Sequence, residues 1–207
     1  MPWTKYALDK FFGHKLSELV TCGAEELPVL SRYLPAFLLS SVFQVTYKPE
    51  FRAYAFNFIR RIEQAALEYG EGRTSLERYL RDPNKAVSRY YQALSHFEQG
   101  VALIIQAAKF LERLGPEKLF KQGGNPDLER LNRVYNASKH MEGQIAEGLI
   151  PTNALAAVWI TNDGVECRDA KVAFKEMREL IVEGHEVARQ IVEEVPKRVQ
   201  GSERPRD

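Results

Sequence analysis

The fold class is decided by residues 101–111, whose sequence is VALIIQAAKFL. Drawn as a helix, this stretch is apolar in almost every direction, which is typical of a helix buried between several neighbours. A turn signal at 82–84 precedes the stretch, and Leu114-Gly115-Pro116 ends it, so the predicted helix covers residues 85–113. A long helix surrounded on all sides predicts a bundle of helices.

Helical spacing of apolar residues predicts the other members of this bundle. Helices are predicted at residues 9–20 and at 34–45, the second of them buried. A core helix begins at Pro49 and is ended by Gly70 and Gly72, and after a link at 73–75 a short helical piece covers 76–81. A further helix covers 126–141, after a Gly-rich loop at 123–125. Asp169 is expected to cap a last helix that continues to Pro196. The stretch at 34–45 is too short and too polar to cross a membrane.

Residues 158–168 depart from the helical pattern. Two runs with strand character, at 158–161 and 165–168, flank Asn162-Asp163-Gly164, which is a strong signal for a β-hairpin. The sequence therefore predicts an all-α bundle in one domain, residues 1–200, with a small C-terminal hairpin before the last helix. Residues 201–207 are predicted to be a disordered tail.

Composition limits the classes of function. The 207 residues are 44% hydrophobic, which is enough for one substantial core. Lys and Arg number 29 against 28 Asp and Glu, so no overall field attracts nucleic acid or an anionic membrane, and any anion site must be local. Cys22 and Cys167 belong to no metal or redox pattern and are expected to be reduced in a cytoplasmic protein, with a disulfide left open. The N-terminus lacks the features of an export signal.

The strongest candidate for chemistry lies in the predicted helix 126–141. Arg133 and His140 are seven residues apart, almost two helical turns, so their side chains point within about 20° of each other. Arginine is a permanent cation shaped for phosphate, and histidine transfers protons near neutral pH. Asn136 and Ala137 share this direction, away from the apolar stripe of the helix. The pair is therefore expected to face water, or a groove formed with a second copy of the chain.

These residues carry a family resemblance. The helical layout and the spacing of Arg, six residues and His resemble the HEPN superfamily, helical bundles in which Arg, four to six residues and His form a metal-independent endoribonuclease motif. The likeness covers residues 85–194, and its motif carries over only Arg133 and His140. Many active members have a polar residue after the arginine, often Asn, where this chain has Val134; its nearest asparagine is Asn136.

The resemblance implies a metal-independent endoribonuclease or an RNA-binding protein, and a homodimer whose motif helices meet and form one composite active site. The catalytic residues would be Arg133, which holds the phosphate, and His140, which acts as general base or acid while the RNA 2′-OH attacks that phosphate. Asn136 and Lys139 are the predicted RNA contacts, Asn136 near the pair and Lys139 on the RNA backbone. No metal and no cofactor is predicted. A toxin-antitoxin or phage-defence setting follows from the same resemblance, with an antitoxin or a defence complex as partner.

Two other interpretations stay open. In the first, Arg133 and His140 are a solvated helix face that happens to hold this spacing. In the second, the chain is a non-catalytic helical interaction protein that acts as a dimer or as a subunit of a larger assembly.

Other polar residues give weaker signals. Three histidines have no matching partner and are predicted to be structural: His14, His96 and His185. None of the four histidines belongs to a Glu-x-x-His motif, the pattern of carboxylate-bridged metal pairs in helical bundles. A loose basic cluster is interspersed with acids and predicts a mixed-charge surface; its members are Arg73, Arg78, Arg81 and Arg89.

Overall fold

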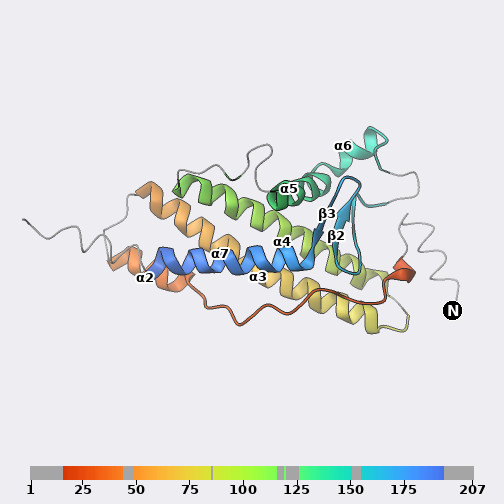
Figure 1. Ribbon diagram of the computed structural model, residues 1–207, viewed down its shortest axis with the longest axis horizontal. Helices are drawn as coiled ribbons and strands as arrows, with labels where there is room; N and C mark the ends of the chain where they lie inside the picture. Colours follow the sequence, from red (N-terminus) through yellow and green to blue (C-terminus); the bar gives the residue numbers. More distant parts are fainter. Residues whose placement is uncertain are drawn as a thin grey trace, which may run out of the picture.

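The computed structural model describes residues 16–43, 49–84, 86–115, 119, 126–150 and 155–193. In chain order its elements are the 3-10 helix η1 (Leu16–Glu18), α2 (Leu34–Phe43), α3 (Pro49–Arg81), α4 (Val87–Leu114), α5 (Pro126–Lys139), α6 (Met141–Ala146), β1 (Val158–Ile160), β2 (Gly164–Cys167), β3 (Ala170–Ala173) and α7 (Phe174–Glu193). Figure 1 shows α3, α4 and α7 along the body of the molecule, with α2 at one end and the sheet toward the other. The described chain is mainly helical.

The apolar stretch 101–111 lies within α4, and the predicted long helix is confirmed. Val101, Leu103 and Ile105 are fully buried, because α4 packs along α3 and also contacts α5 and α7. The Gly115 N–H donates to the Leu111 carbonyl at 3.2 Å where the helix ends. One sequence segment thus organises most of the helical packing.

The prediction that Gly70 and Gly72 end a helix is wrong. α3 continues through both glycines and through residues 73–75 to Arg81. A Cβ atom at Gly72 would lie 3.1–3.2 Å from ring carbons of Phe97 on α4. The missing side chain allows the two helices to pack closely, and this packing offsets the roughly 1 kcal/mol that glycine loses to alanine in a helix interior.

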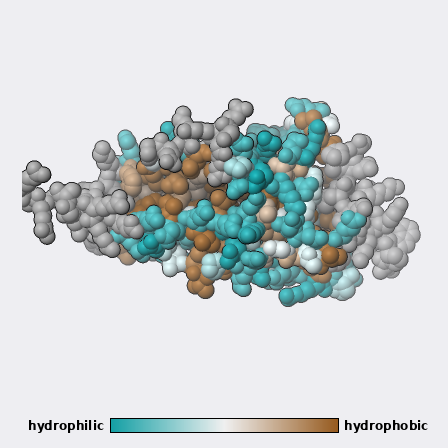
Figure 2. Space-filling model, in the orientation of Figure 1, coloured by the Kyte–Doolittle hydropathy of each residue, from teal (hydrophilic) through white to brown (hydrophobic). Residues whose placement is uncertain are grey.

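Buried side chains form two clusters that share the same long helices. The larger cluster joins α3, α4 and α5 to the sheet and α7, and within it the rings of Phe97 and Phe174 lie 4.7 Å apart. The smaller cluster includes Phe37 of α2, Phe58 of α3 and Ile191 of α7. Figure 2 shows hydrophobic surface toward the end where α3 begins and α4 ends, whereas the surface over α5 and along α7 is largely hydrophilic.

The predicted hairpin is confirmed, and a third strand extends it. The strands are antiparallel in the order β1-β2-β3 within the described residues. The expected helix cap at Asp169 is wrong, because Arg168 and Asp169 form a turn and Ala170–Ala173 pairs with β2. Val172 lies opposite Val165 in this pairing, and both are buried. α7 begins only at Phe174, where Glu176 accepts a hydrogen bond from the Ala173 N–H at 2.9 Å.

The expectation of a buried helix at 34–45 is only half right. α2 forms there, and Glu63 of α3 accepts the N–H groups of Tyr33 and Leu34 at its start, at 2.6 and 3.0 Å. Phe37 is 2% exposed, but Leu38 and Leu39 are 45% and 61% exposed. The helix packs on α3 and α7 and leaves other side chains exposed. Its apolar composition therefore predicted more burial than the helix has.

Other expectations fall partly or wholly outside the described residues. Of the predicted helix at 9–20, the structure describes only the C-terminal end, where η1 is followed by irregular chain. The whole loop at 123–125 and the whole tail at 201–207 also lie outside. Among the helices that are described, none combines the length and the apolar character needed to cross a membrane.

Candidate functional site

The motif helix is α5, and its sequence explains both its start and its position. Pro126 opens the helix, followed by acidic residues in the first turn that suit the positive end of the helix dipole. Leu128, Leu131 and Val134 are buried against α4 and the sheet, which α5 contacts. Leu131 and Val134 are almost inaccessible, at 0% and 1% exposed. Val134, next to Arg133, therefore serves packing.

A polar contact ties α5 to α7. Arg130 donates to Glu176 of α7 and to Asp127 of its own helix, the second contact at 2.5 Å. The hydrogen bond to Glu176 raises the pKa of the Arg130 guanidinium, with the charge of Asp127 acting in the same direction. On α4, burial raises the pKa of the Glu98 carboxyl, and a hydrogen bond from Ser138 of α5 opposes that shift. α5 is thus anchored to two helices.

Four predicted residues form an exposed surface, which we call the motif face: Arg133, Asn136, Lys139 and His140. The sequence expectation that they point away from the subunit core is confirmed for these four. It is wrong for Ala137, which is only 6% exposed and packs in the core. Small helical side chains on the edge of a polar face are readily covered by a neighbouring element, here the sheet.

The structure changes the position of His140. The predicted helix 126–141 ends at Lys139, and His140 stands in the turn before α6 with φ −111° and ψ 29°. Its N–H still donates to the Asn136 carbonyl at 3.0 Å, and its carbonyl accepts from Gln144 at 3.2 Å. Backbone hydrogen bonds on both sides fix the turn, so the histidine stands at a defined corner between two helices.

α6 ends in a motif that directs the following chain back toward α5. Gly148 has a positive φ of 66°, a conformation that favours glycine. Its N–H donates to the Ile145 carbonyl, and the Leu149 N–H donates to the Gln144 carbonyl, the two bonds of a Schellman motif. This reversal places Gln144 and Leu149 beside the same cavity.

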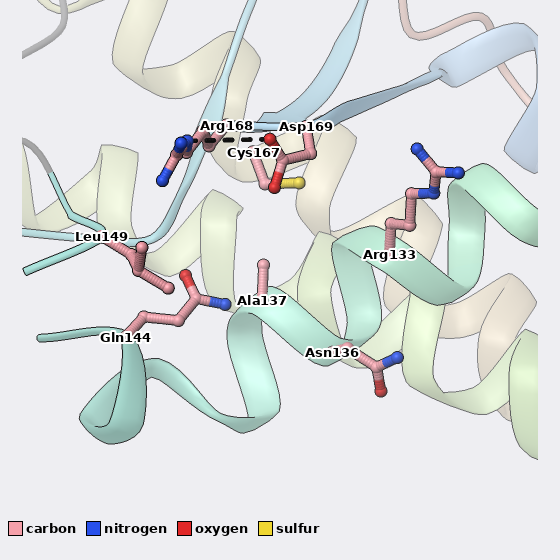
Figure 3. Close-up of a pocket in the computed structure, with 8 residues that line it drawn as sticks. All are labelled: Arg133, Asn136, Ala137, Gln144, Leu149, Cys167, Arg168 and Asp169. Carbon is pink, nitrogen blue, oxygen red and sulfur yellow. Dashed lines mark ion pairs between the residues drawn. The ribbon is translucent and has the colours of Figure 1, made fainter. Parts of the chain in front are cut away.

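That cavity, the Arg133 pocket, is an open pocket of about 560 Å³ between α5, α6 and the turn that joins β2 to β3. Its lining residues are Arg133, Asn136, Ala137, Gln144, Leu149, Cys167, Arg168 and Asp169. Figure 3 shows Arg168 and Asp169 across from α5, the Arg133 guanidinium at one end, and Gln144 with Leu149 at the other. The Asn136 amide points away from the β2–β3 turn. His140 is not part of the lining.

The charges around the pocket favour an anion. Arg133 makes no ion pair with any described residue. Arg168 approaches Asp169 at 3.7 Å, with the side chains 60% and 73% exposed, a separation and exposure at which an ion pair contributes little. Two arginines and one carboxylate leave an excess of positive charge, and the guanidinium groups offer paired donors suited to phosphate oxygens.

Sequence reasoning missed several pocket residues. Arg168 and Asp169 line the same pocket as Arg133 because the sheet docks on α5, a contact between separate segments that periodicity does not reveal. Lys139, predicted as an RNA contact, lies with Nζ 5.7 Å from the centroid of the Tyr135 ring. It stands outside the Arg133 pocket.

Most of the described residues among the other candidates are paired with a neighbour or buried. His96 pairs with Glu68 at 2.7 Å, and His185 is 5% exposed, whereas His14 lies outside the described residues. The basic cluster is neutralised in part, because Arg73 and Arg81 pair with Glu77 and Arg89 pairs with Asp82. Both cysteines have free thiols. In the part of the chain that is described, no three His, Cys, Asp or Glu side chains gather as a metal site would require.

Comparison of the chain with protein-family models, with curated proteins and with solved structures gave no match. The class that the structure itself defines is a mainly helical protein with a small three-stranded antiparallel sheet docked on its motif helix.

Proposed function

We propose that this protein binds RNA at the motif face and cleaves it without a metal ion, as a variant of the HEPN helical bundle. The observation that carries the proposal is the joint exposure of Arg133, midway along α5, and of His140, just after the helix, with Arg133 unpaired among the described residues and lining a pocket. An unpaired arginine and an accessible histidine on one exposed face would supply phosphate binding and proton transfer.

The proposed reaction is transesterification. The 2′-oxygen of a ribose forms a bond to the adjacent phosphorus while the bond to the 5′-oxygen of the next nucleotide breaks, leaving a 2′,3′-cyclic phosphate and a 5′-hydroxyl. A base accepts the proton of the 2′-OH, and an acid gives a proton to the departing 5′-oxygen. His140 supplies one of these roles, and Arg133 offsets the charge that develops on the phosphate.

The second proton-transfer group is proposed to come from a second copy of the chain. α6 follows His140 directly and has no buried residue. Within α6, Met141 and Ile145 are 38% and 58% exposed and lie four residues apart, a spacing that aligns side chains on one helical face. An apolar stripe beside His140 supports a homodimer in which two histidines face one phosphate. The toxin or phage-defence setting, with its partner protein, rests on the family resemblance alone.

The test is RNA cleavage by the purified full-length protein in the presence of EDTA. Wild type is compared with Arg133→Ala and His140→Ala, and with Arg81→Ala as a matched control because the Arg81 side chain is 82% exposed on α3. We expect products with cyclic phosphate ends, a loss of about 100-fold or more in each motif variant, and no change in the control. Absence of cleavage, or cleavage that both motif variants retain, contradicts the nuclease.

A second candidate is a non-catalytic helical interaction protein, favoured by the apolar stripe of α6 and by the position of His140 outside the Arg133 pocket. Analytical ultracentrifugation of wild type and of the double variant Met141→Ser, Ile145→Ser separates the two candidates when combined with the cleavage assay. A dimer that the double variant abolishes, in a protein that cuts no RNA, supports the interaction protein. Loss of both dimer and cleavage in the same variant supports the composite nuclease site.

A further inference from the structure

We propose that the Arg133 pocket holds one nucleotide of the RNA strand and selects its base through the β2–β3 turn. This inference rests on the proposed function, because it assigns the ligand of the same surface. The cleavage reaction itself needs Arg133 and His140, yet the pocket contains further polar groups from α6 and from the turn, and these have no part in the reaction.

The size and the chemical mixture of the pocket fit a nucleotide. A volume of about 560 Å³ lies in the range of small-molecule sites. The lining combines two guanidinium groups, one carboxylate, side-chain amides and the apolar side chains of Ala137 and Leu149. A nucleotide carries the matching parts, namely an anionic phosphate, polar edges and the apolar faces of its base. A purely apolar ligand would leave the arginines without a partner.

The phosphate is assigned to the two arginines. The Arg133 guanidinium lies at one end of the cavity and the Arg168 guanidinium toward the other, with Asp169 between them (Figure 3), so Arg168 has to turn toward a phosphate held by Arg133. Guanidinium groups bind phosphate oxygens through pairs of parallel N–H donors. The 3.7 Å contact between Arg168 and Asp169 is exposed and weak, so Arg168 turns to an incoming phosphate at little cost.

Base selection is assigned to Asp169. An ionised carboxylate only accepts hydrogen bonds, so Asp169 favours a base that presents N–H groups. Guanine offers two neighbouring N–H donors, at N1 and at the exocyclic amine, and matches the two oxygens of one carboxylate. We therefore expect the pocket to prefer guanine to the other three bases.

The backbone of the turn is preorganised for this role. Cys167 and Ala170 are register partners in the β2–β3 hairpin, and both strands contact α5. Cys167 is 4% exposed and anchors the turn in the core, whereas Arg168 and Asp169 project from it. A site whose backbone is already ordered loses less entropy on binding than a mobile loop would.

The experiment measures binding to the full chain by calorimetry. The probes are inorganic phosphate, the four ribonucleoside monophosphates, and a 2′-O-methyl RNA hexamer with one guanosine, which lacks the 2′-OH needed for cleavage. The variants are Arg168→Gln and Asp169→Asn, with Arg81→Gln as the matched control. We expect Arg168→Gln to weaken binding of the hexamer and of GMP about tenfold, and Asp169→Asn to abolish the preference for GMP over the other monophosphates.

Each outcome decides one of the two proposals. Binding of GMP and of the hexamer that Arg168→Gln and Asp169→Asn leave unchanged overturns the nucleotide pocket, and so does binding of inorganic phosphate alone. If the motif variants still abolish RNA cleavage in that case, the proposed function stands. If nucleotides bind with the expected dependence on Arg168 and Asp169 but no RNA is cut, the pocket stands and the nuclease is contradicted.

Discussion

α4 and α6 are both helices of this chain, but different forces hold them in place. Phe97, Val101 and Leu103 represent a long buried surface of α4, whereas α6 has no buried residue and is fixed at its ends by backbone hydrogen bonds. The first helix stabilises the fold, and the second presents side chains beside the motif face. Stability and function are therefore expected to respond to different substitutions.

The largest effect is expected at Phe97, which is fully buried between the rings of Tyr69 and Phe174, with centroids 5.9 and 4.7 Å away. Phe97→Ala removes these contacts and leaves a cavity, so the free energy of unfolding falls by about 3–5 kcal/mol. Urea denaturation measures this change. Leu67→Ala on α3, at a side chain 59% exposed, is the control and stays within about 0.5 kcal/mol of wild type. A loss below about 1 kcal/mol at Phe97 would contradict the packing described.

The next effect concerns the sheet at Gly164. A Cβ atom there would lie 2.2 Å from the Val172 carbonyl oxygen and 2.9 Å from the Ala173 Cα, so backbone has to move. We expect Gly164→Ala to lower the free energy of unfolding by about 2–3 kcal/mol. The control is Gly70→Ala, where nothing lies within 4 Å of the new methyl group and helix propensity alone favours a gain of up to about 1 kcal/mol. Equal stability of the two variants would refute the close approach.

A smaller effect is expected at Tyr90, whose hydroxyl accepts the Ile160 N–H at 2.9 Å in the buried region where β1 meets α4. Tyr90→Phe leaves that N–H without its partner and lowers the free energy of unfolding by about 1–2 kcal/mol. Tyr69→Phe is the comparison, because the Tyr69 hydroxyl bonds to the carbonyl of the exposed Glu25, which water can satisfy. Thermal denaturation compares the stability of the two variants, and we expect Tyr90→Phe to lose more. A larger loss in Tyr69→Phe would contradict the role given to the Tyr90 hydroxyl.

The free energy of unfolding is expected to depend on pH through the buried His185. Burial lowers its pKa below the ordinary 6.5, against the opposing charge of Glu63. Because the unfolded chain then binds the proton more readily, stability is retained above pH 6.5 and falls as pH drops through 6.5 toward the folded-state pKa. His185→Phe removes this part of the pH dependence. Urea denaturation at pH 7.5 and pH 5.0 measures it, and an unchanged difference between the two pH values would exclude His185 as its source.

The smallest change in stability is expected on the functional side of the comparison. Arg133→Ala and Ile145→Ser alter exposed side chains and should change the free energy of unfolding by no more than about 0.5 kcal/mol. Denaturation of both variants checks this value. A loss above about 2 kcal/mol at Arg133 or at Ile145 would mean that the motif face or α6, respectively, stabilises the subunit, and would contradict the separation between α4 and α6.

Local sequence patterns predicted the helices and strands better than they predicted which of these elements contact one another. The apolar run of α4 and the Asn-Asp-Gly turn each specify one structure with little help from the rest of the chain. Gly72 misled because its packing partner Phe97 is on another helix. Asp169 resembled a helix cap, yet it belongs to a turn that exists because β3 pairs with β2.

The candidate site was predictable to the same extent. Helical spacing was enough to place Arg133 and Asn136 on an exposed surface. The position of Arg168 depends on how the sheet docks against α5, which no single segment encodes. The sequence therefore indicated Arg133 as the cation of the site, whereas the other residues that line its pocket became apparent only from the tertiary structure.

The uninterrupted course of α3 has a consequence for cooperativity. The same helix contributes Phe58 and Ile62 to the smaller buried cluster and Tyr69 to the larger one, and it continues past Gly70 and Gly72 to Leu76 of the larger cluster. A continuous backbone couples the two clusters, so neither can melt alone without fraying the shared helix. The calorimetric and van't Hoff enthalpies of unfolding should then agree, as they do when a chain unfolds in a single step.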